Sequence, residues 1–139
     1  MPAVKVDRIN TRAPLPFVLA EHVLGPDTGA NTVSKFLGQV PLTGGPLQLT
    51  RVLLIPSANI ALDADSTTFS VQNVAGTVTY ASTTNAAAIT AAAGVALTLT
   101  SDAASIAAGT LLRMVAVNVV NGQVLNTTTL NFQAEFQPV

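Results

Sequence analysis

The clearest alternation of hydrophobic and polar residues lies near the end of the chain, in residues 129–136. Leu130, Phe132, Ala134 and Phe136 fall on one side of an extended chain, and polar residues fall on the other. This period of two is typical of an antiparallel strand with one face in a core and one in water. Burial of each Phe ring should contribute about 1.5–3 kcal/mol, so this strand is predicted to anchor the core.

The segment before it, residues 111–120, is apolar on both faces and is interrupted only by Arg113 and Asn118. Such a pattern is typical of a central strand or of a strand in an interface. The dipeptide Asn121-Gly122 follows, and it supplies the two positive-φ residues that a type I′ turn requires. The pattern therefore predicts a long β-hairpin over residues 110–136, folded at this dipeptide.

Further strands are predicted earlier in the chain. Residues 47–55 form a strand candidate that ends at Pro56. Residues 67–74 and 77–82 both alternate in polarity, and a turn signal at Gly76 joins them into a second hairpin. The residues expected to point inward in this second hairpin are Phe69, Val71, Val78 and Tyr80.

The middle of the chain allows two interpretations. Asn85, the alanine-rich residues 86–93 and Gly94 have the cap, interior and stop of a two-turn helix. The same stretch resembles residues 106–112, because in both a large apolar residue precedes small residues, a glycine and an apolar strand. Residues 86–93 are therefore left open between helix and strand, and a β conformation is favoured for residues 106–110.

Residues 95–100 are expected to form another strand with Leu97 and Leu99 inward. Residues 47–139 then contain about six to eight short strands separated by turns, which is typical of a sandwich or barrel. The predicted fold class is all-β: a jelly-roll-like antiparallel β-sandwich over residues 47–139, preceded by an extended, irregular N-terminal arm over residues 1–46.

The arm is predicted from its composition, since residues 1–46 hold six of the eight prolines and show no sustained period. It is nevertheless too apolar for a solvated linker, so it should lie on its own β-domain or on a neighbouring molecule. Residues 17–24 are expected to be a short strand or two helical turns. The arm also carries Lys5, Arg8 and Arg12, which are expected to dock on a partner together with Phe17 and Leu19.

The composition bounds the class of protein further. Only 9% of the residues are charged, the formal net charge is −1 and no cysteine is present. A surface so poor in charge favours a protein that is covered by partners. Neither nucleic acid nor membrane is expected as a partner, because no basic excess exists and no apolar run approaches the roughly 18 residues of a span. The first residues contain no apolar stretch of a secretory signal, so synthesis in the cytoplasm is expected.

Candidate chemistry is sparse, and no enzymatic activity is expected. His22 is the only histidine, and no nucleophile motif accompanies it. The carboxylates Asp63 and Asp65 have the spacing of some calcium loops, but the glycine and the terminal glutamate of such loops are missing. Paired carboxylates for glycoside hydrolysis would have to come from Asp63, Asp65, Asp102 or Glu135. The aromatic platform of a sugar cleft is missing, however, because the chain has no Trp and a single Tyr. No catalytic residue, metal site or cofactor is therefore assigned.

The chain as a whole resembles a family of phage proteins. A short cysteine-free chain with a Pro- and Gly-rich apolar arm precedes an Ala-, Thr- and Val-rich β-domain, with segments such as residues 105–112 and 117–124. This pattern is similar to that of the small decoration or cement proteins of tailed-bacteriophage capsids, of the jelly-roll type found in a Bordetella phage.

The resemblance implies a structural virion protein on the outer capsid surface. Such a protein would bind the major capsid protein, cement neighbouring subunits and act as a homo-oligomer, with a dimer favoured. The N-terminal arm would reach across a joint between capsomers, and its contacts would be multiplied by avidity. The alternative is a receptor- or glycan-binding β-sandwich module of a phage tail or fibre, against which the scarcity of aromatic residues argues.

Overall fold

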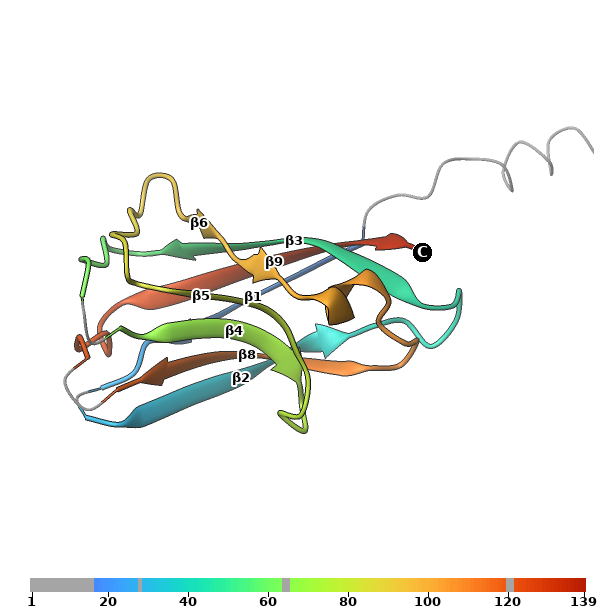
Figure 1. Cartoon of the computed structure of the whole chain (residues 1–139), viewed down its shortest axis with the longest axis horizontal. Helices are drawn as coiled ribbons and strands as arrows, with labels where there is room; N and C mark the ends of the chain where they lie inside the picture. Colours follow the sequence, from blue (N-terminus) through green and yellow to red (C-terminus); the bar gives the residue numbers. More distant parts are fainter. Residues whose placement is uncertain (1–16, 28, 64–65, 120–121) are drawn as a thin grey trace, which may run out of the picture.

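The computed structural model describes residues 17–27, 29–63, 66–119 and 122–139, which fold as two antiparallel sheets packed face to face (Figure 1). Sheet A contains, in spatial order, β1 (Phe17–Leu24), β9 (Thr129–Pro138), β3 (Leu47–Pro56) and β6 (Val95–Ala96). Sheet B contains β2 (Asn31–Gln39), β8 (Leu111–Asn118), β4 (Thr68–Asn73), β5 (Thr79–Thr84) and β7 (Thr98–Leu99). One 3₁₀ helix, η1 (Ser101–Ala104), follows β7. The antiparallel β-sandwich predicted from the sequence is confirmed.

The strands pair in a nested order. β4 pairs with β5, β3 with β6, β2 with β8 and β1 with β9, so the chain resembles one long ribbon of paired strands. The ribbon is rolled up, because β9 also pairs with β3 and β8 also pairs with β4. Most successive strands therefore lie in opposite sheets, which is the double Greek-key arrangement of a jelly roll.

The hairpin predicted over residues 110–136 is wrong. β8 and β9 are both strands, but β8 lies between β2 and β4 in sheet B, whereas β9 lies between β1 and β3 in sheet A. Asn121 lies outside the described residues. Each apolar strand gains two sheet neighbours in this arrangement, and a two-stranded hairpin would give it only one. The expectation that residues 111–120 include a central strand is confirmed.

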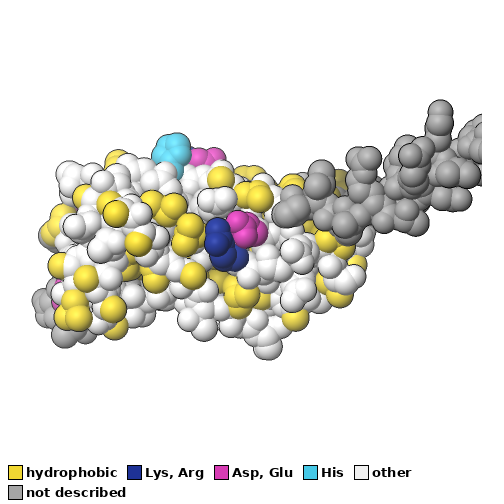
Figure 2. All heavy atoms as spheres, turned by 90° about the horizontal axis from the view of Figure 1, so that it is seen from above, with side chains coloured by type: hydrophobic (Ala, Val, Ile, Leu, Met, Phe, Trp, Pro, Cys, Tyr) yellow, Lys and Arg dark blue, Asp and Glu magenta, His cyan; other side chains and the backbone are white. Residues whose placement is uncertain are grey.

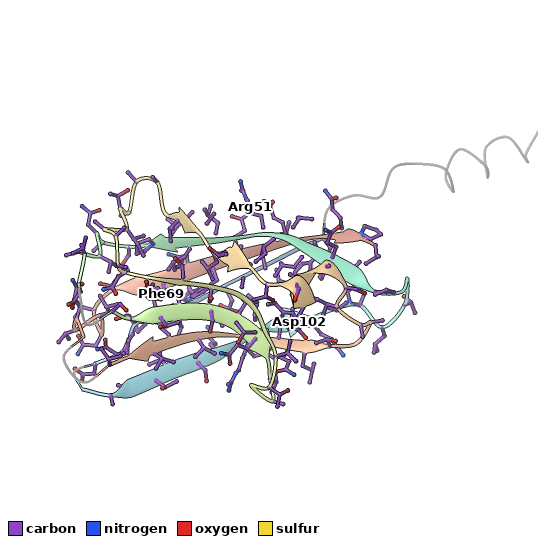
Figure 3. All side chains as sticks on the ribbon, in the orientation of Figure 1. Arg51, Phe69 and Asp102 are labelled. Atoms are coloured by element: carbon purple, nitrogen blue, oxygen red, sulfur yellow. The ribbon has the colours of Figure 1, made fainter. Side chains whose placement is uncertain are left out.

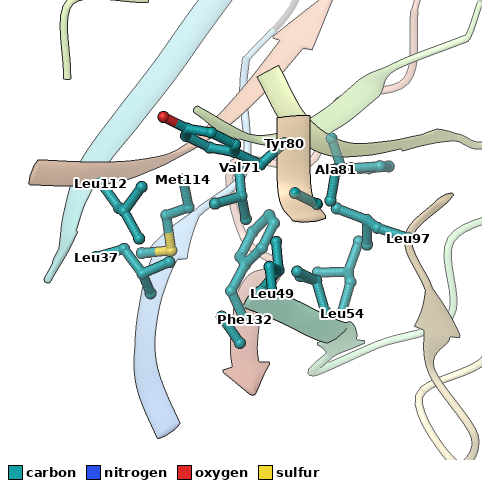
Figure 4. Close-up of a cluster of buried hydrophobic side chains, with 14 of the residues drawn as sticks. Leu37, Leu49, Leu54, Val71, Tyr80, Ala81, Leu97, Leu112, Met114 and Phe132 are labelled. Atoms are coloured by element: carbon teal, nitrogen blue, oxygen red, sulfur yellow. The ribbon is translucent and has the colours of Figure 1, made fainter. Parts of the chain in front are cut away.

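The core lies between the sheets and is built from the inward residues of both. The four apolar residues of β9 that alternate in the sequence are at most 1% exposed, as predicted. Phe69 projects from β4 into the same layer, whereas Arg51 projects from β3 into solvent (Figure 3). In Figure 4, Leu49, Leu54 and Phe132 of sheet A pack close to Val71, Leu112 and Met114 of sheet B.

Part of the predicted N-terminal arm is regular. β1 and β2 lie within residues 1–46, and they form edge strands of sheet A and sheet B respectively. The expectation of an irregular course is therefore wrong for these two strands. Of the two alternatives for residues 17–24, the strand is correct. Alternating residues of β1 are half-buried, so the alternation of apolar and polar residues is weaker than in a central strand. The prolines around β1 obscured this alternation in the sequence.

The second predicted hairpin and the strand over residues 47–55 are confirmed as β4–β5 and β3. The strand predicted over residues 95–100 is wrong as a single element. β6 pairs with β3 in sheet A, and β7 pairs with β5 in sheet B, so the chain crosses between the sheets at Leu97. Leu97 is buried as expected, but Leu99 is 38% exposed because β7 is the edge of sheet B.

The repeated sequence pattern in the middle of the chain corresponds to a repeated structure. Ile89 forms an isolated antiparallel bridge with Ile60, and Ile106 forms one with Leu47. In both cases a glycine with positive φ follows, Gly94 at 66° and Gly109 at 83°, and a strand begins within two residues. Residues 86–93 are therefore neither a helix nor a regular strand. Each isoleucine anchors a turn on the core before the chain enters the next strand.

A buried amide ties together the loops at the end of the sandwich where β8 ends. Asn118 is 1% exposed, and its Nδ2 donates hydrogen bonds to the backbone carbonyls of Asp27 (3.0 Å) and Gln123 (2.9 Å). Its Oδ1 accepts a hydrogen bond from the hydroxyl of Thr67 (2.9 Å). Asn118, one of the two polar residues in an otherwise apolar strand, thus forms hydrogen bonds with polar groups from three separate loops.

Candidate interaction surface

The side chains with possible catalytic chemistry belong to separate elements. His22 is exposed on β1, Asp102 lies in η1, and Glu135 on β9 forms an ion pair with Arg51 (Nη2 to Oε1 3.2 Å). Asp65 lies outside the described residues. Among the described residues, no three His, Asp or Glu side chains lie close enough together to hold a metal ion. That part of the chain also contains no helix that is long and apolar enough to cross a membrane.

The outer face of sheet A, called the A face, combines apolar and charged side chains (Figure 2). Its residues are Val18, Ala20, His22, Leu24, Arg51, Leu53, Ile55, Asn131, Gln133 and Glu135. A shallow depression of about 240 Å³ lies between His22, Ile55 and Gln133. The Asn131 amide beside it already donates a hydrogen bond to the carbonyl of Ile55 (2.9 Å). The A face therefore offers a small depression beside a histidine.

The outer face of sheet B, called the B face, carries more exposed large hydrophobic side chains than the A face and is nearly free of charge. It is formed by Thr32, Ser34, Phe36, Thr68, Ser70, Gln72, Val74, Ser82, Leu111, Arg113, Val115 and Val117. Four of its hydrophobic side chains are exposed, with accessibilities of 53% for Phe36, 45% for Leu111, 44% for Val74 and 37% for Val117, whereas Val115 is buried. The strands β2, β8 and β4 that carry them form the lower layer in Figure 1.

Arg113 is the one charged residue of the B face. Its Nη2 donates a hydrogen bond to Oε1 of Gln72 on the neighbouring strand (2.9 Å). Its Nε is buried and has no hydrogen-bond partner among the described residues. Phe36 lies directly opposite Arg113 in the register of β2 and β8, so the aromatic side chain and the guanidinium group are cross-strand neighbours.

This composition matches that of the buried centre of a protein interface. Such centres are depleted in charge and enriched in aromatic residues and arginine. Burial of the four exposed hydrophobic side chains by a partner favours binding by roughly 1 kcal/mol for each half-exposed side chain. The B face can therefore bind another protein surface with only one charged group, the guanidinium of Arg113, to desolvate.

The residues expected to contact a partner from the arm have different positions. Phe17 and Leu19 are half-buried and pack against the core of their own domain. The ring of Phe17 lies 5.7 Å from that of Phe136, and Leu19 lies against Gly38 of β2. Phe17 and Leu19 thus hold β1 in the sandwich rather than extending from it. Lys5, Arg8 and Arg12 lie outside the described residues, so their role stays a prediction.

The B face was not identified from the sequence. Phe36 belongs to a segment whose prolines and glycines predict an irregular course, and they obscure its alternation with Ser34 and Thr32. Leu111 and Val117 belong to a strand whose sequence is apolar on both faces, so its pattern does not indicate which face is exposed. The signal that was available is that the outer positions of the strands of sheet B include one charge, Arg113.

Comparison with protein-family models and with curated protein sequences gives no match for this chain.

Proposed function

We propose that this protein is a structural virion protein that binds the outer surface of a phage capsid and cements neighbouring subunits of the major capsid protein. The observation that carries the proposal is the B face, a sheet surface with four exposed hydrophobic side chains and a single charged residue, Arg113. A monomer in solution seldom exposes such side chains together on one face, because burying them in an interface is favourable.

The jelly-roll order of the strands is the fold that the resemblance to capsid decoration proteins leads one to expect. A sandwich with one nearly uncharged sheet face suits this role, since a shell presents the same surface many times. Lys5, Arg8 and Arg12 precede β1, and in this proposal they contact a neighbouring capsid subunit and extend the footprint of the B face. The protein needs no cofactor for this function, and it acts on the outside of the virion.

The test is co-sedimentation of the purified protein with capsid shells that lack it. The wild-type protein is expected to sediment with the shells until its sites are saturated. Phe36→Ala and Val117→Thr, on the B face, are expected to weaken binding about tenfold each, which corresponds to about 1.4 kcal/mol. Val18→Thr on the A face is the matched control, because Val18 is exposed to a similar degree, 43%.

Equal loss of binding in the A-face control would show that the B face is not the docking surface. Absence of any sedimentation of the folded wild-type protein with shells would refute the capsid proposal. In that case the alternative, a receptor- or glycan-binding module, would be tested on a glycan array. The depression beside His22 on the A face is the place to mutate in that experiment.

A further inference from the structure

The two sheets have long free edges on the same side of the sandwich. β1 is the edge of sheet A and β2 is the edge of sheet B, and the two strands contact each other through Leu19 and Gly38. An edge strand presents a row of unpaired backbone N–H and C=O groups that can pair with another chain. Which groups are free follows from the hydrogen bonds of the neighbouring strands, because the bonding direction alternates along a strand.

The free edge of β1 is blocked at its centre. The N–H of Gly25 bonds to the carbonyl of Thr128, so by alternation the backbone groups of Ala20 and His22 face away from β9. The N–H of His22 donates to Oε1 of Glu21 (3.1 Å), and the carbonyl of His22 accepts a hydrogen bond from Nζ of Lys35 (3.0 Å). The two charged side chains therefore occupy the groups that an added strand would need.

The free edge of β2 has no such block. The N–H of Val74 bonds to the carbonyl of Leu111, which fixes the alternation in β8 and leaves the backbone groups of Thr32, Ser34 and Phe36 facing away from it. No side chain or loop of the described residues bonds to these groups. The side chains at the same positions are uncharged and lie on the B face. Lys35, between them, points to the other side of the strand and is paired with Glu21 (3.1 Å).

We propose that a second copy of this chain pairs antiparallel along the free edge of β2, in a register centred on Ser34. In this register Thr32 lies opposite Phe36 of the second copy, and each aromatic ring packs on a β-branched side chain, which is a favourable cross-strand pair. The pairing is self-complementary, as a twofold interface requires. The pairing brings no unpaired charges together, because the ammonium group of Lys35 is already neutralised within its own subunit.

The orientation of the two copies in this dimer affects how it would dock on a shell, a point that rests on the proposed function. The twofold axis between two antiparallel strands is perpendicular to the sheet, so both copies of the B face point in the same direction. Sheet B becomes one continuous sheet with twice the docking area. Binding of one copy then makes binding of the other effectively intramolecular, and the dimer binds a shell far more tightly than a monomer.

The test compares the molar mass of the full chain and its variants by size-exclusion chromatography with light scattering. The wild-type protein is expected to have twice the chain mass of 14.2 kDa, and the Ser34→Pro variant is expected to have the mass of a single chain. Proline removes a free N–H without breaking the ladder to β8, as it does at edge strands generally. Ala20→Pro is the matched control at the equivalent position of the β1 edge, and it is expected to remain a dimer.

Ser34→Lys is a second variant that retains the N–H and places two like charges opposite each other at the twofold axis. It is also expected to be monomeric, and it covers the case in which Ser34→Pro fails to fold. A monomeric wild-type protein, or a dimer that survives both substitutions, would overturn the inference. A wild-type dimer that ignores capsid shells would leave the β2 interface intact and refute only the capsid proposal.

Discussion

Nζ of Lys35 on β2 lies 3.1 Å from Oε1 of Glu21 on β1, and this ion pair closes the side of the sandwich where the two sheets have their free edges. Both residues occupy inward positions on edge strands. A charge that points inward at an edge discourages the addition of further strands. The pair therefore links the two sheets and, through His22, protects the edge of sheet A.

Glu21 should make the stability of the fold depend on pH in the acidic range. The hydrogen bond from the N–H of His22, and then that from Lys35, hold the pKa of Glu21 below its ordinary value of 4.5. A carboxylate whose pKa is lower in the folded state stabilises the fold above its unfolded pKa, and this contribution is lost as the pH falls through its folded pKa. Thermal unfolding is expected to show a lower melting temperature for Glu21→Gln near neutral pH, and the same temperature as the wild type at strongly acidic pH. A difference that persists in acid would mean that the charge is not responsible.

Phe132 and Phe36 should respond in opposite ways to the same substitution. Phe132 is 1% exposed, so Phe132→Ala leaves a cavity between the sheets and is expected to cost about 3–5 kcal/mol of unfolding free energy. Phe36 is 53% exposed on the B face, so Phe36→Ala is expected to change the stability of the monomer by less than about 0.5 kcal/mol. Urea denaturation of both variants, in the monomeric Ser34→Pro background, measures the contrast. Similar losses for the two would show that Phe36 is part of the core.

Gly94 should tolerate no side chain. Its φ is +66°, and a Cβ there would lie 2.5 Å from the backbone carbonyl oxygen of Leu54, which cannot move without breaking the pairing of β3 with β6. Gly45 also has a positive φ, +78°, but has open space around it. Gly45→Ala is expected to cost about 1 kcal/mol from backbone strain alone, whereas Gly94→Ala should cost clearly more. Equal unfolding free energies for the two variants would remove the close approach as the reason for glycine at position 94.

The Asn118 amide should be among the most important polar groups for stability. Asn118→Ala leaves two backbone carbonyls and the hydroxyl of Thr67 without their buried partner, so a loss of about 2–4 kcal/mol is expected in chemical denaturation. Asn131→Ala is the control. It removes a single hydrogen bond, from an exposed amide to the carbonyl of Ile55, and is expected to cost less than about 1 kcal/mol. A small effect at Asn118 would mean that water replaces the amide at this end of the sandwich.

Local sequence patterns predicted the strands that have one clearly buried face. The alternation of β9 and of the β4–β5 hairpin is visible in a single chain segment, because each residue's environment repeats every second position. The repeated pattern around Ile89 and Ile106 left residues 86–93 open between helix and strand, because the bridge that each isoleucine forms involves a residue about 30 or more positions away. Edge strands gave a weaker signal. β1 and β2 are only half-buried, and the prolines and glycines around them suggested an irregular arm.

The sequence alone was sufficient to predict an all-β sandwich with few charged residues and a central apolar strand that contains two polar residues. These features follow from composition and periodicity, which depend on the residues themselves. It could not predict which strands pair, because a period of two is the same in a hairpin and in a jelly roll. Asn121-Gly122 therefore suggested a hairpin, whereas β8 lies in sheet B and β9 lies in sheet A. The B face, the ion pair of Glu21 with Lys35 and the open edge of β2 all arise from residues far apart in the chain. Only the packing of the two sheets brings these residues together and decides which side chains stay in water.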